Sequence, residues 1–171
     1  MRRARNALAL VACLVVGGGL LAACDGGTSV TTVTGTPRTD PSVTIAIEPS
    51  PAGPVLATGR GRTLYDFAPD SPTHSACVTT ICVQVWPPLI VTGRPTVGKG
   101  LHASLAGTVR RKDGTLQATY GGHPLYTWKG DTGSGVITGQ ALLNAGGYWY
   151  VIAPTGQQVT RAFTVLGKSG T

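Results

Sequence analysis

The chain has 171 residues, of which 12% are charged and 42% hydrophobic, and its formal net charge at pH 7 is +7. Three of the positive charges are Arg2, Arg3 and Arg5, and without them the charge falls from +7 to +4. A surplus this small does not indicate a nucleic-acid partner. The one basic cluster, residues 110–112, precedes Asp113-Gly114 and is typical of an exposed hairpin tip.

The N-terminal segment has the layout of an export signal. An apolar run over residues 7–23 follows the arginines and ends in Leu-Ala-Ala-Cys24, which resembles the bacterial lipobox. The resemblance implies that residues 1–23 are a lipoprotein signal peptide and that the Cys24 thiol carries a diacylglyceryl group with fatty acids such as palmitate. We expect membrane lipid to be a partner and the mature protein to be lipid-anchored on the extracytoplasmic face of the cell membrane. The alternatives are an ordinary signal peptide with an incidental cysteine, or an uncleaved anchor.

Residues 24–42 are dominated by Thr, Gly, Ser and Pro. A segment of this composition cannot bury enough apolar surface to offset the entropy lost on ordering. We therefore expect a flexible stalk over residues 24–42 and a folded domain over residues 43–166.

Strand patterns dominate the expected domain, and no window shows a sustained helical period. The fold class is predicted to be all-β, an antiparallel meander. The expected strands cover residues 43–47, 63–67, 82–86, 108–111, 115–120, 125–128, 148–153 and 162–166. Lys112-Asp113-Gly114 and Gly121-Gly122 are predicted to be tight hairpin turns.

The domain contains an internal repeat. Residues 61–70 and 122–131 both follow Gly-x-x-Leu-Tyr-x-aromatic-x-x-Asp, and every matched position is offset by 61. Each copy is followed by an expected tryptophan-bearing strand, with Trp86 in the first and Trp149 in the second. A unit of about 60 residues buries little surface alone. We therefore expect repeat 1 (about 43–105) and repeat 2 (about 106–166) to pack as one pseudo-symmetric domain.

These residues resemble a known family. The paired Leu-Tyr-x-aromatic-x-x-Asp motifs, a cysteine pair running into Trp-Pro-Pro-Leu, and Gly-His-Pro-Leu-Tyr are similar to the secreted bacterial lipoprotein repeat defined by a Tyr-x-aromatic-x-x-Asp motif. The resemblance covers residues 56–154 and implies an exported protein with tandem copies. The family has no established activity, so the resemblance implies no function.

The motif itself allows two interpretations. Residues i and i+2 of a strand share a face, so Tyr65 projects with Phe67 and Tyr126 with Trp128. One interpretation is an aromatic core pair with a turn-fixing carboxylate, Asp70 or Asp131, playing equivalent structural roles in both copies. The other is a ligand-binding shelf of aromatic faces with a carboxylate at its rim. We favour the structural interpretation, because folding determinants must recur in each repeat whereas a single site need not.

Cys77 and Cys82 are the thiols that remain once Cys24 is acylated and Cys13 is removed with the signal. In an oxidising compartment a disulfide between them is expected. The alternative is a metal, haem or electron-handling site that uses His74 with the two cysteines. That site lacks an evident fourth ligand, so we expect no cofactor.

An enzymatic role receives little support. Asp131-Thr-Gly-Ser is similar to the aspartic-protease signature, but the corresponding loop of the first copy has Pro72 in place of the glycine. Signatures of serine hydrolases, phosphate-binding loops and zinc proteases are missing from the sequence. The sequence therefore predicts a non-catalytic module, tethered outside the cytoplasm, that binds an unknown ligand or supports the cell envelope.

Overall fold

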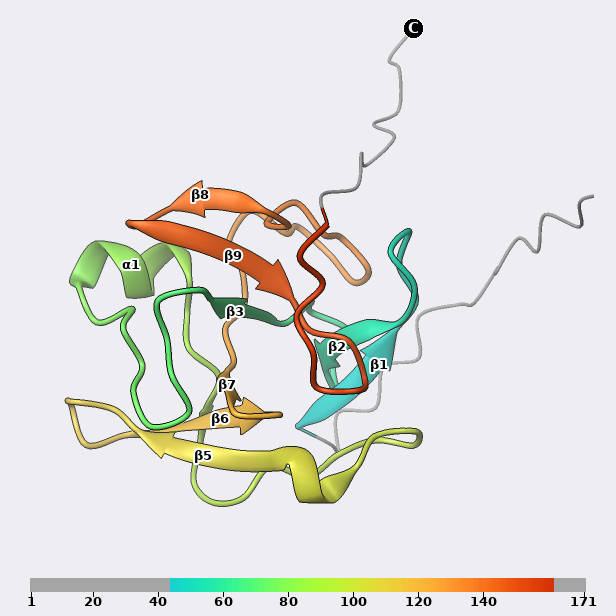
Figure 1. The fold of residues 1–171 in the computed structure, drawn as a ribbon, viewed down its shortest axis with the longest axis horizontal. Coiled ribbons are helices and arrows are strands. Elements are labelled where there is room, and N and C mark those ends of the chain that lie inside the picture. The colour runs from blue at the N-terminus through green and yellow to red at the C-terminus, as the bar shows by residue number, and fades with distance from the viewer. Residues whose placement is uncertain (1–43, 162–171) are drawn as a thin grey trace, which may run out of the picture. The chain divides into compact units, whose positions relative to one another are not determined.

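A computed structural model describes residues 44–161, and strands dominate this region (Figure 1). The expected signal peptide, Cys24, the expected stalk and the strand expected over residues 162–166 lie outside the described residues. The strands are β1 (Ile45–Glu48), β2 (Val55–Thr58), β3 (Tyr65–Phe67), β4 (Ile90–Val91), β5 (Ala106–Arg110), β6 (Leu116–Tyr120), β7 (His123–Pro124), β8 (Leu142–Asn144) and β9 (Gly147–Val151). Two short helices, α1 (Thr80–Val85) and a 3-10 turn η1 (Ala103–Leu105), interrupt them.

The strands form three small sheets, and every pair of named strands is antiparallel, which confirms the predicted fold class. β1 pairs with β2; β9 lies between β3 and β8; and β6 pairs with β5, β4 and β7. The β5–β6–β7 and β8–β9 connections follow chain order as in a meander. The pairing of β3 with β9 instead joins strands far apart in the sequence.

Both predicted hairpin turns are present. Tyr120 pairs with His123 across Gly121 and Gly122, whose φ angles are +59° and +86°. Positive φ at both central residues is the type I′ geometry, which glycine adopts without steric strain. In the β5–β6 turn Gly114, with φ of +85°, donates its N–H to the Arg111 carbonyl at 3.0 Å.

The prediction of a strand over residues 82–86 was wrong, because these residues lie in α1 and at its C-terminal end. Thr79 accepts a hydrogen bond from the Cys82 N–H at 3.2 Å and thereby caps the helix at its N-terminus. The Trp86 N–H then bonds to the Cys82 carbonyl at 2.8 Å and closes the last turn. β-branched residues favour a strand locally, but the side-chain cap and the fixed Cys82 impose the helix.

Other differences concern short or irregular strands. β2, β4, β7 and β8 were not predicted. Residues 125–128, predicted as a strand, form no regular ladder; Tyr126 makes isolated bridges to Tyr65 on one side and Pro88 on the other. Pro88 has no N–H to donate, so a ladder cannot continue there.

The motif segment of each copy pairs with the segment that follows the motif of the other copy. β3 of the first copy pairs with β9 of the second, in the register Phe67–Trp149. In the second copy, Tyr126 instead bridges Pro88 of the first. Two backbone hydrogen bonds between the copies show the same reciprocal pairing. Leu56 of the first copy donates to the Ile152 carbonyl of the second, and Ala118 of the second donates to the Leu89 carbonyl of the first, both at 2.8 Å. The two copies therefore pack as one pseudo-symmetric domain, as predicted, and each completes the other's sheet.

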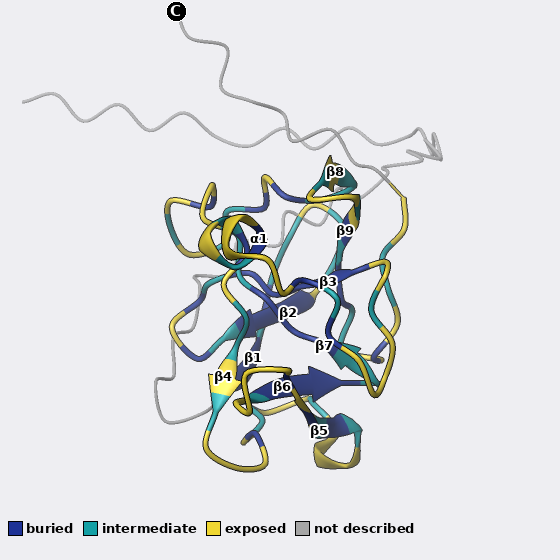
Figure 2. Ribbon diagram, turned by 90° about the vertical axis from the view of Figure 1, so that its left-hand side faces the viewer, coloured by how far each residue is buried: buried dark blue, intermediate teal, exposed yellow. Residues whose placement is uncertain are grey.

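Buried residues form two clusters, visible as the dark interior of Figure 2. One is aliphatic and lies among β1, β2, β5 and β6, with Leu56, Leu64, Tyr120 and Leu125 fully buried. The other is aromatic and contains the motif side chains together with the two cysteines. The aromatic cluster holds the candidate site residues.

Candidate functional site

The two motif tyrosines meet at the centre of the domain. Tyr65 and Tyr126 exchange both backbone hydrogen bonds, each at 2.9 Å, and both side chains are fully buried. Each ring packs edge-on against a tryptophan, Tyr65 against Trp86 at 5.4 Å and Tyr126 against Trp149 at 5.1 Å between centroids. The pseudo-twofold axis therefore passes between the tyrosines, and each of them contacts a residue of both copies.

A column of four stacked rings crosses this axis. Trp86 and Trp149 lie at its middle, parallel to within 2° and 3.8 Å apart between centroids. Phe67 stacks on the outer face of Trp149 at 4.3 Å, and Trp128 stacks on the outer face of Trp86 at 4.2 Å. The first three rings are buried and Trp128 is partly exposed. The second aromatic residue of each motif thus stacks on the tryptophan that follows the other copy's motif.

Asp131 is buried and accepts three hydrogen bonds. Its Oδ2 accepts the Tyr65 hydroxyl at 2.8 Å, and its Oδ1 accepts both the backbone N–H and the hydroxyl of Thr138 at 2.8 Å. Burial and the Asp131 charge raise the pKa of the Tyr65 phenol well above its ordinary value. A carboxylate of the second copy is thus hydrogen-bonded to a tyrosine of the first.

Asp70 has a related but weaker set of contacts. Its Oδ1 accepts the Ala76 N–H at 2.6 Å, while its Oδ2 has no hydrogen-bond partner. Burial and the Asp70 charge raise the pKa of Tyr126 to about 12, but the Tyr126 hydroxyl is bonded to Ser75 at 2.7 Å. Both aspartates therefore hold a downstream loop through a backbone N–H, although only Asp131 bonds directly to a motif tyrosine.

Cys77 and Cys82 form a disulfide with a Cα–Cα distance of 5.6 Å, and both are buried. His74 is exposed in a small turn, where it exchanges backbone hydrogen bonds with Ser71. Because the two sulfur atoms are bonded to each other, neither is a thiolate that could bind a metal ion. Within residues 44–161 no three His, Cys, Asp or Glu side chains are grouped so that they could hold one.

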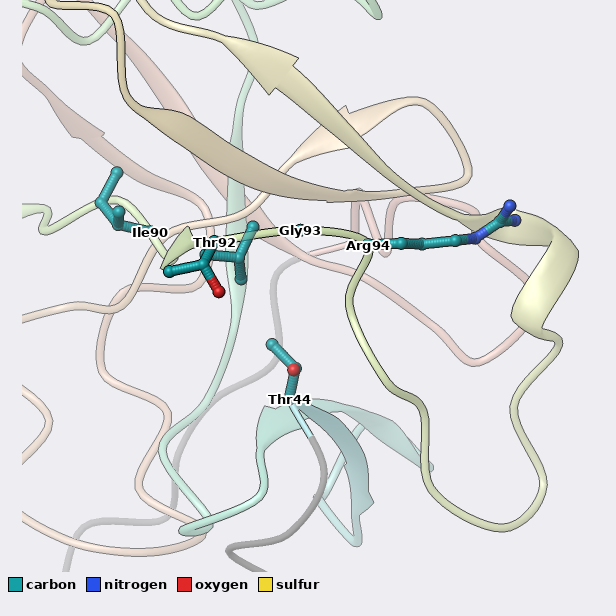
Figure 3. Close-up of a pocket in the computed structure, with 6 residues that line it drawn as sticks. Thr44, Ile90, Thr92, Gly93 and Arg94 are labelled. Atoms are coloured by element: carbon teal, nitrogen blue, oxygen red, sulfur yellow. The ribbon is translucent and has the colours of Figure 1, made fainter.

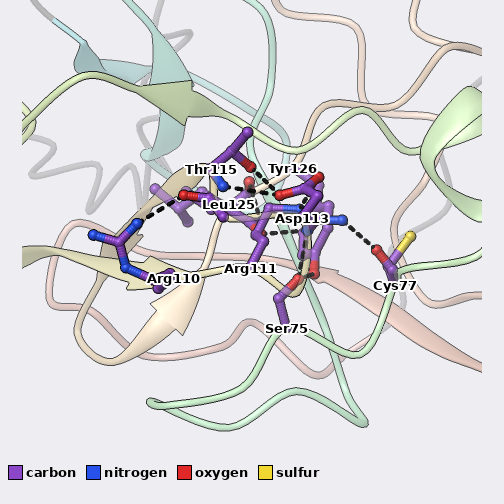
Figure 4. Close-up of polar contacts among 10 residues, drawn as sticks. Ser75, Cys77, Arg110, Arg111, Asp113, Thr115, Leu125 and Tyr126 are labelled. Atoms are coloured by element: carbon purple, nitrogen blue, oxygen red, sulfur yellow. Dashed lines mark hydrogen bonds and ion pairs between the residues drawn. The ribbon is translucent and has the colours of Figure 1, made fainter.

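Arg111 corrects the prediction of a wholly exposed basic turn. Arg110 and Lys112 are exposed, but Arg111 is buried. Figure 4 shows its guanidinium reaching the disulfide loop, where it donates to Ser75 Oγ at 2.6 Å and to the Cys77 carbonyl at 2.7 Å. Gln117 Oε1 accepts a further bond at 2.6 Å. The β5–β6 hairpin is thereby fastened to the loop that precedes α1, a contact between the two copies.

Another buried carboxylate, outside the repeated motif positions, was missed by the sequence analysis. Asp66 lies in β3, and its Oδ2 contacts His123 Nδ1 at 3.1 Å and is also hydrogen-bonded to Gln158. The hydrogen bond to Asp66 raises the pKa of His123 above its ordinary value. At an offset of 61, Asp66 corresponds to Thr127 and His123 to Arg62, so neither residue recurs in the other copy. The sequence could have indicated this pair, because Asp66 and His123 are polar residues at positions where two otherwise matching copies differ.

Raised pKa values predict that the domain loses stability as the pH rises. Burial raises the pKa of Asp70 to about 6 from 3.8, and His123 is also raised, so the folded state binds more protons than the unfolded state from about pH 4 to above pH 6.5. We expect the Tm to be higher at pH 5 than at pH 8, with Asp70 alone contributing up to about 3 kcal/mol. Thermal melts from pH 4 to pH 8 measure this.

Two variants separate the contributions of Asp70 and His123 to the pH dependence of the Tm. Asp70→Asn should reduce the decrease between pH 4 and 6, to which the raised pKa of the buried Glu48 also contributes, and His123→Gln should remove the part above pH 6. A wild-type Tm that rises steadily from pH 5 to pH 8 would contradict the assignment.

A surface pocket of about 340 Å³ lies away from the motif core, between the start of β1 and the segment after β4. Figure 3 shows Thr44 facing this segment, with Ile90, Thr92 and Arg94 along it. The Arg94 guanidinium donates to the Ala103 carbonyl at 2.9 Å, which holds it against the start of η1. The pocket brings together none of the predicted site residues.

Neither helix within residues 44–161 has the length and apolar character needed to cross a bilayer. A family model described as a secreted repeat of unknown function matches the chain twice, over residues 49–90 and 107–153, which together make up more than half of its length. No curated protein sequence and no solved structure matches the chain.

Proposed function

Because the chain belongs to the family of secreted repeats of unknown function, we propose that it is a lipid-anchored, non-catalytic envelope module whose paired repeats form a scaffold. A secreted repeat acts outside the cytoplasm, so the chain is an extracytoplasmic module. Anchoring through acylated Cys24 and the binding or support role are the further steps of the proposal.

The scaffold role is carried by one observation: the repeated motif forms the contact between the copies. Tyr65, Phe67 and Tyr126 are buried in aromatic packing, and Asp131, 1% exposed, accepts three internal hydrogen bonds. A substrate-binding shelf would need at least one motif carboxylate free to meet a ligand. The Asp131 carboxylate is occupied by Tyr65 and Thr138. The Asp70 Oδ2 atom has no partner but is buried away from the surface, so neither carboxylate is open to a ligand, which supports a structural rather than a catalytic role.

Cys24 is the proposed attachment point. It follows the apolar run at the place where a lipobox cysteine stands, with about twenty residues between it and β1. A single acyl chain binds a bilayer only marginally, whereas the two or three chains of a bacterial lipoprotein make a durable tether. Such a tether would keep the scaffold at the envelope while leaving its surface accessible.

We expect Cys24→Ala to abolish fatty-acid incorporation and to leave the chain unprocessed or released. The measurement is labelled-palmitate incorporation with membrane fractionation in the expressing bacterium. Cys13→Ala is the matched control, because Cys13 lies within the apolar run and should be removed with it; this variant should be labelled like the wild type. Label that persists in Cys24→Ala would refute the anchor.

A further inference from the structure

One end of the domain exposes apolar side chains that the fold does not use. Ile81 is 76% exposed, Leu143 63%, Tyr148 46% and Val78 39%. Ile81 lies in α1 and Val78 in the loop before it; Leu143 and Tyr148 are cross-strand neighbours in the β8–β9 hairpin. We name these four residues the apolar end.

α1 and the β8–β9 hairpin lie next to each other. Trp86, which ends α1, donates its indole N–H to the Asn144 side chain at 2.9 Å and stacks on Trp149 of β9. Figure 1 places α1 close to the start of β9, and Figure 2 places α1, β8 and β9 at the same end of the domain. The two elements also correspond across the pseudo-twofold axis. At the end of α1 the Val85 carbonyl accepts the Lys129 N–H, and at the matching place in β9 the Tyr148 carbonyl accepts the Ala68 N–H. The four exposed side chains therefore come from matching parts of the two copies.

The segments that build this end carry almost no charge. Residues 75–93 and 132–160 contain no Asp, Glu, Lys or Arg. Four exposed cations, Arg94, Lys99, Arg110 and Lys112, lie instead between β4 and β6, and Arg60 follows β2. Lys129 is next to α1, and Arg161, whose carbonyl accepts the Gln140 side chain at 3.0 Å, lies near the start of β8. Burying an unpaired charge in lipid is costly, whereas Ile, Leu and Val enter the acyl boundary favourably and Tyr prefers the headgroup level. A lysine at the rim can keep its ammonium group among the headgroups.

We propose that the apolar end is a membrane-docking face that rests on the lipid bilayer next to the anchor. This inference rests on the proposed function, because the anchor supplies the proximity. About twenty residues separate Cys24 from β1 and can span at most roughly 70 Å, and a tether of this kind holds its domain at an effective concentration of roughly millimolar. Four apolar side chains are too few to recruit a free protein, but they are enough to orient a tethered one. A second copy of the chain is the competing occupant.

The test maps which residues touch lipid, independently of Cys24. The full chain is attached through a C-terminal hexahistidine tag to phosphatidylcholine vesicles that contain nickel-chelating lipid and a phospholipid with a photoactivatable acyl chain. After illumination, labelled peptides are identified by mass spectrometry. We expect about tenfold more label in residues 76–86 and 142–151 than in residues 99–115, in low salt and in 0.5 M NaCl alike.

The double variant Ile81→Ser, Leu143→Ser should lower this labelling about tenfold. Ile90→Ser is the matched control, because Ile90 is 47% exposed on β4, outside the apolar end, and its replacement should leave the labelling unchanged. The variants' Tm values should equal that of the wild type, since exposed side chains contribute little to stability.

Uniform labelling, labelling lost in 0.5 M NaCl, or crosslinks that join the apolar ends of two protein molecules would each overturn the docking face. The last result would identify a second copy as the occupant. Failure of palmitate labelling at Cys24 would refute the anchor but would not alter this measurement, because the tag holds the chain at the bilayer whether or not Cys24 is acylated.

Discussion

Trp149→Ala is expected to cost about 4 kcal/mol of the free energy of unfolding, which lowers the Tm of a domain of this size by roughly 15 °C. Trp149 is fully buried, stacks on Trp86 and Phe67, and meets the edge of Tyr126. Its indole N–H also donates to the Asn144 carbonyl at 3.0 Å. Removing the ring breaks the column and leaves a cavity between the copies. Thermal unfolding followed by circular dichroism measures the loss.

Two neighbouring positions provide controls. Tyr148→Ala, one residue away and half exposed, should melt within about 2 °C of the wild type. Trp128→Ala should lose less than Trp149→Ala, because Trp128 stacks on only one ring and is partly exposed at the end of the column. If Trp149→Ala melted like Tyr148→Ala, the column could not be the principal contact between the copies.

Asp131→Ala is expected to cost about 3 kcal/mol, because it leaves the buried Tyr65 hydroxyl and the Thr138 N–H without their charged acceptor. Asp70→Ala should cost less than about 1 kcal/mol at pH 7.5, since burial raises the pKa of Asp70 to about 6 and disfavours its ionised form in the folded protein. Denaturant unfolding of both variants at pH 7.5 compares them. The sequence predicts equal losses for the repeated aspartates, and the structure predicts unequal ones.

A double-mutant cycle identifies the interaction responsible. Tyr65→Phe removes only the hydroxyl, which donates to Asp131 and also accepts the Gly139 N–H at 3.3 Å. It should cost about 1–2 kcal/mol alone and clearly less in the Asp131→Ala background, where only the Gly139 bond is left to lose. Additive losses would mean that the two side chains act independently. Equal losses in Asp70→Ala and Asp131→Ala would restore the equivalence that the repeat suggests.

The reciprocal exchange explains why the motif recurs. β9 supplies the partner strand of β3, and Trp86 supplies the ring on which Trp128 stacks. A single copy would leave its motif strand with an open edge and its tryptophan without a partner ring. The tyrosine, the second aromatic residue and the following tryptophan are therefore needed in both copies, whereas Asp66 and His123, which join the copies at one place only, are not.

The sequence alone determined the features that depend on neighbours along the chain. Asp113-Gly114 and Gly121-Gly122 make their turns because glycine can adopt positive φ without steric strain. Alternating apolar residues produced β1, β5, β6 and β9 close to their predicted positions. Cys77 and Cys82 were paired correctly because few thiols remain after the expected export. The repeat was visible because the same contacts require the same residue types twice.

Only the tertiary structure decided what each element meets. Residues 82–86 form a helix end because Thr79 caps them and Cys82 is fixed by its disulfide, although their side chains favour a strand. Arg111 is buried, unlike its charged neighbours, because the loop at Ser75 and Cys77, more than thirty residues away in the sequence, supplies its acceptors. Propensity and periodicity report on neighbours along the chain, whereas burial and hydrogen bonding are set by whichever distant segment packs there.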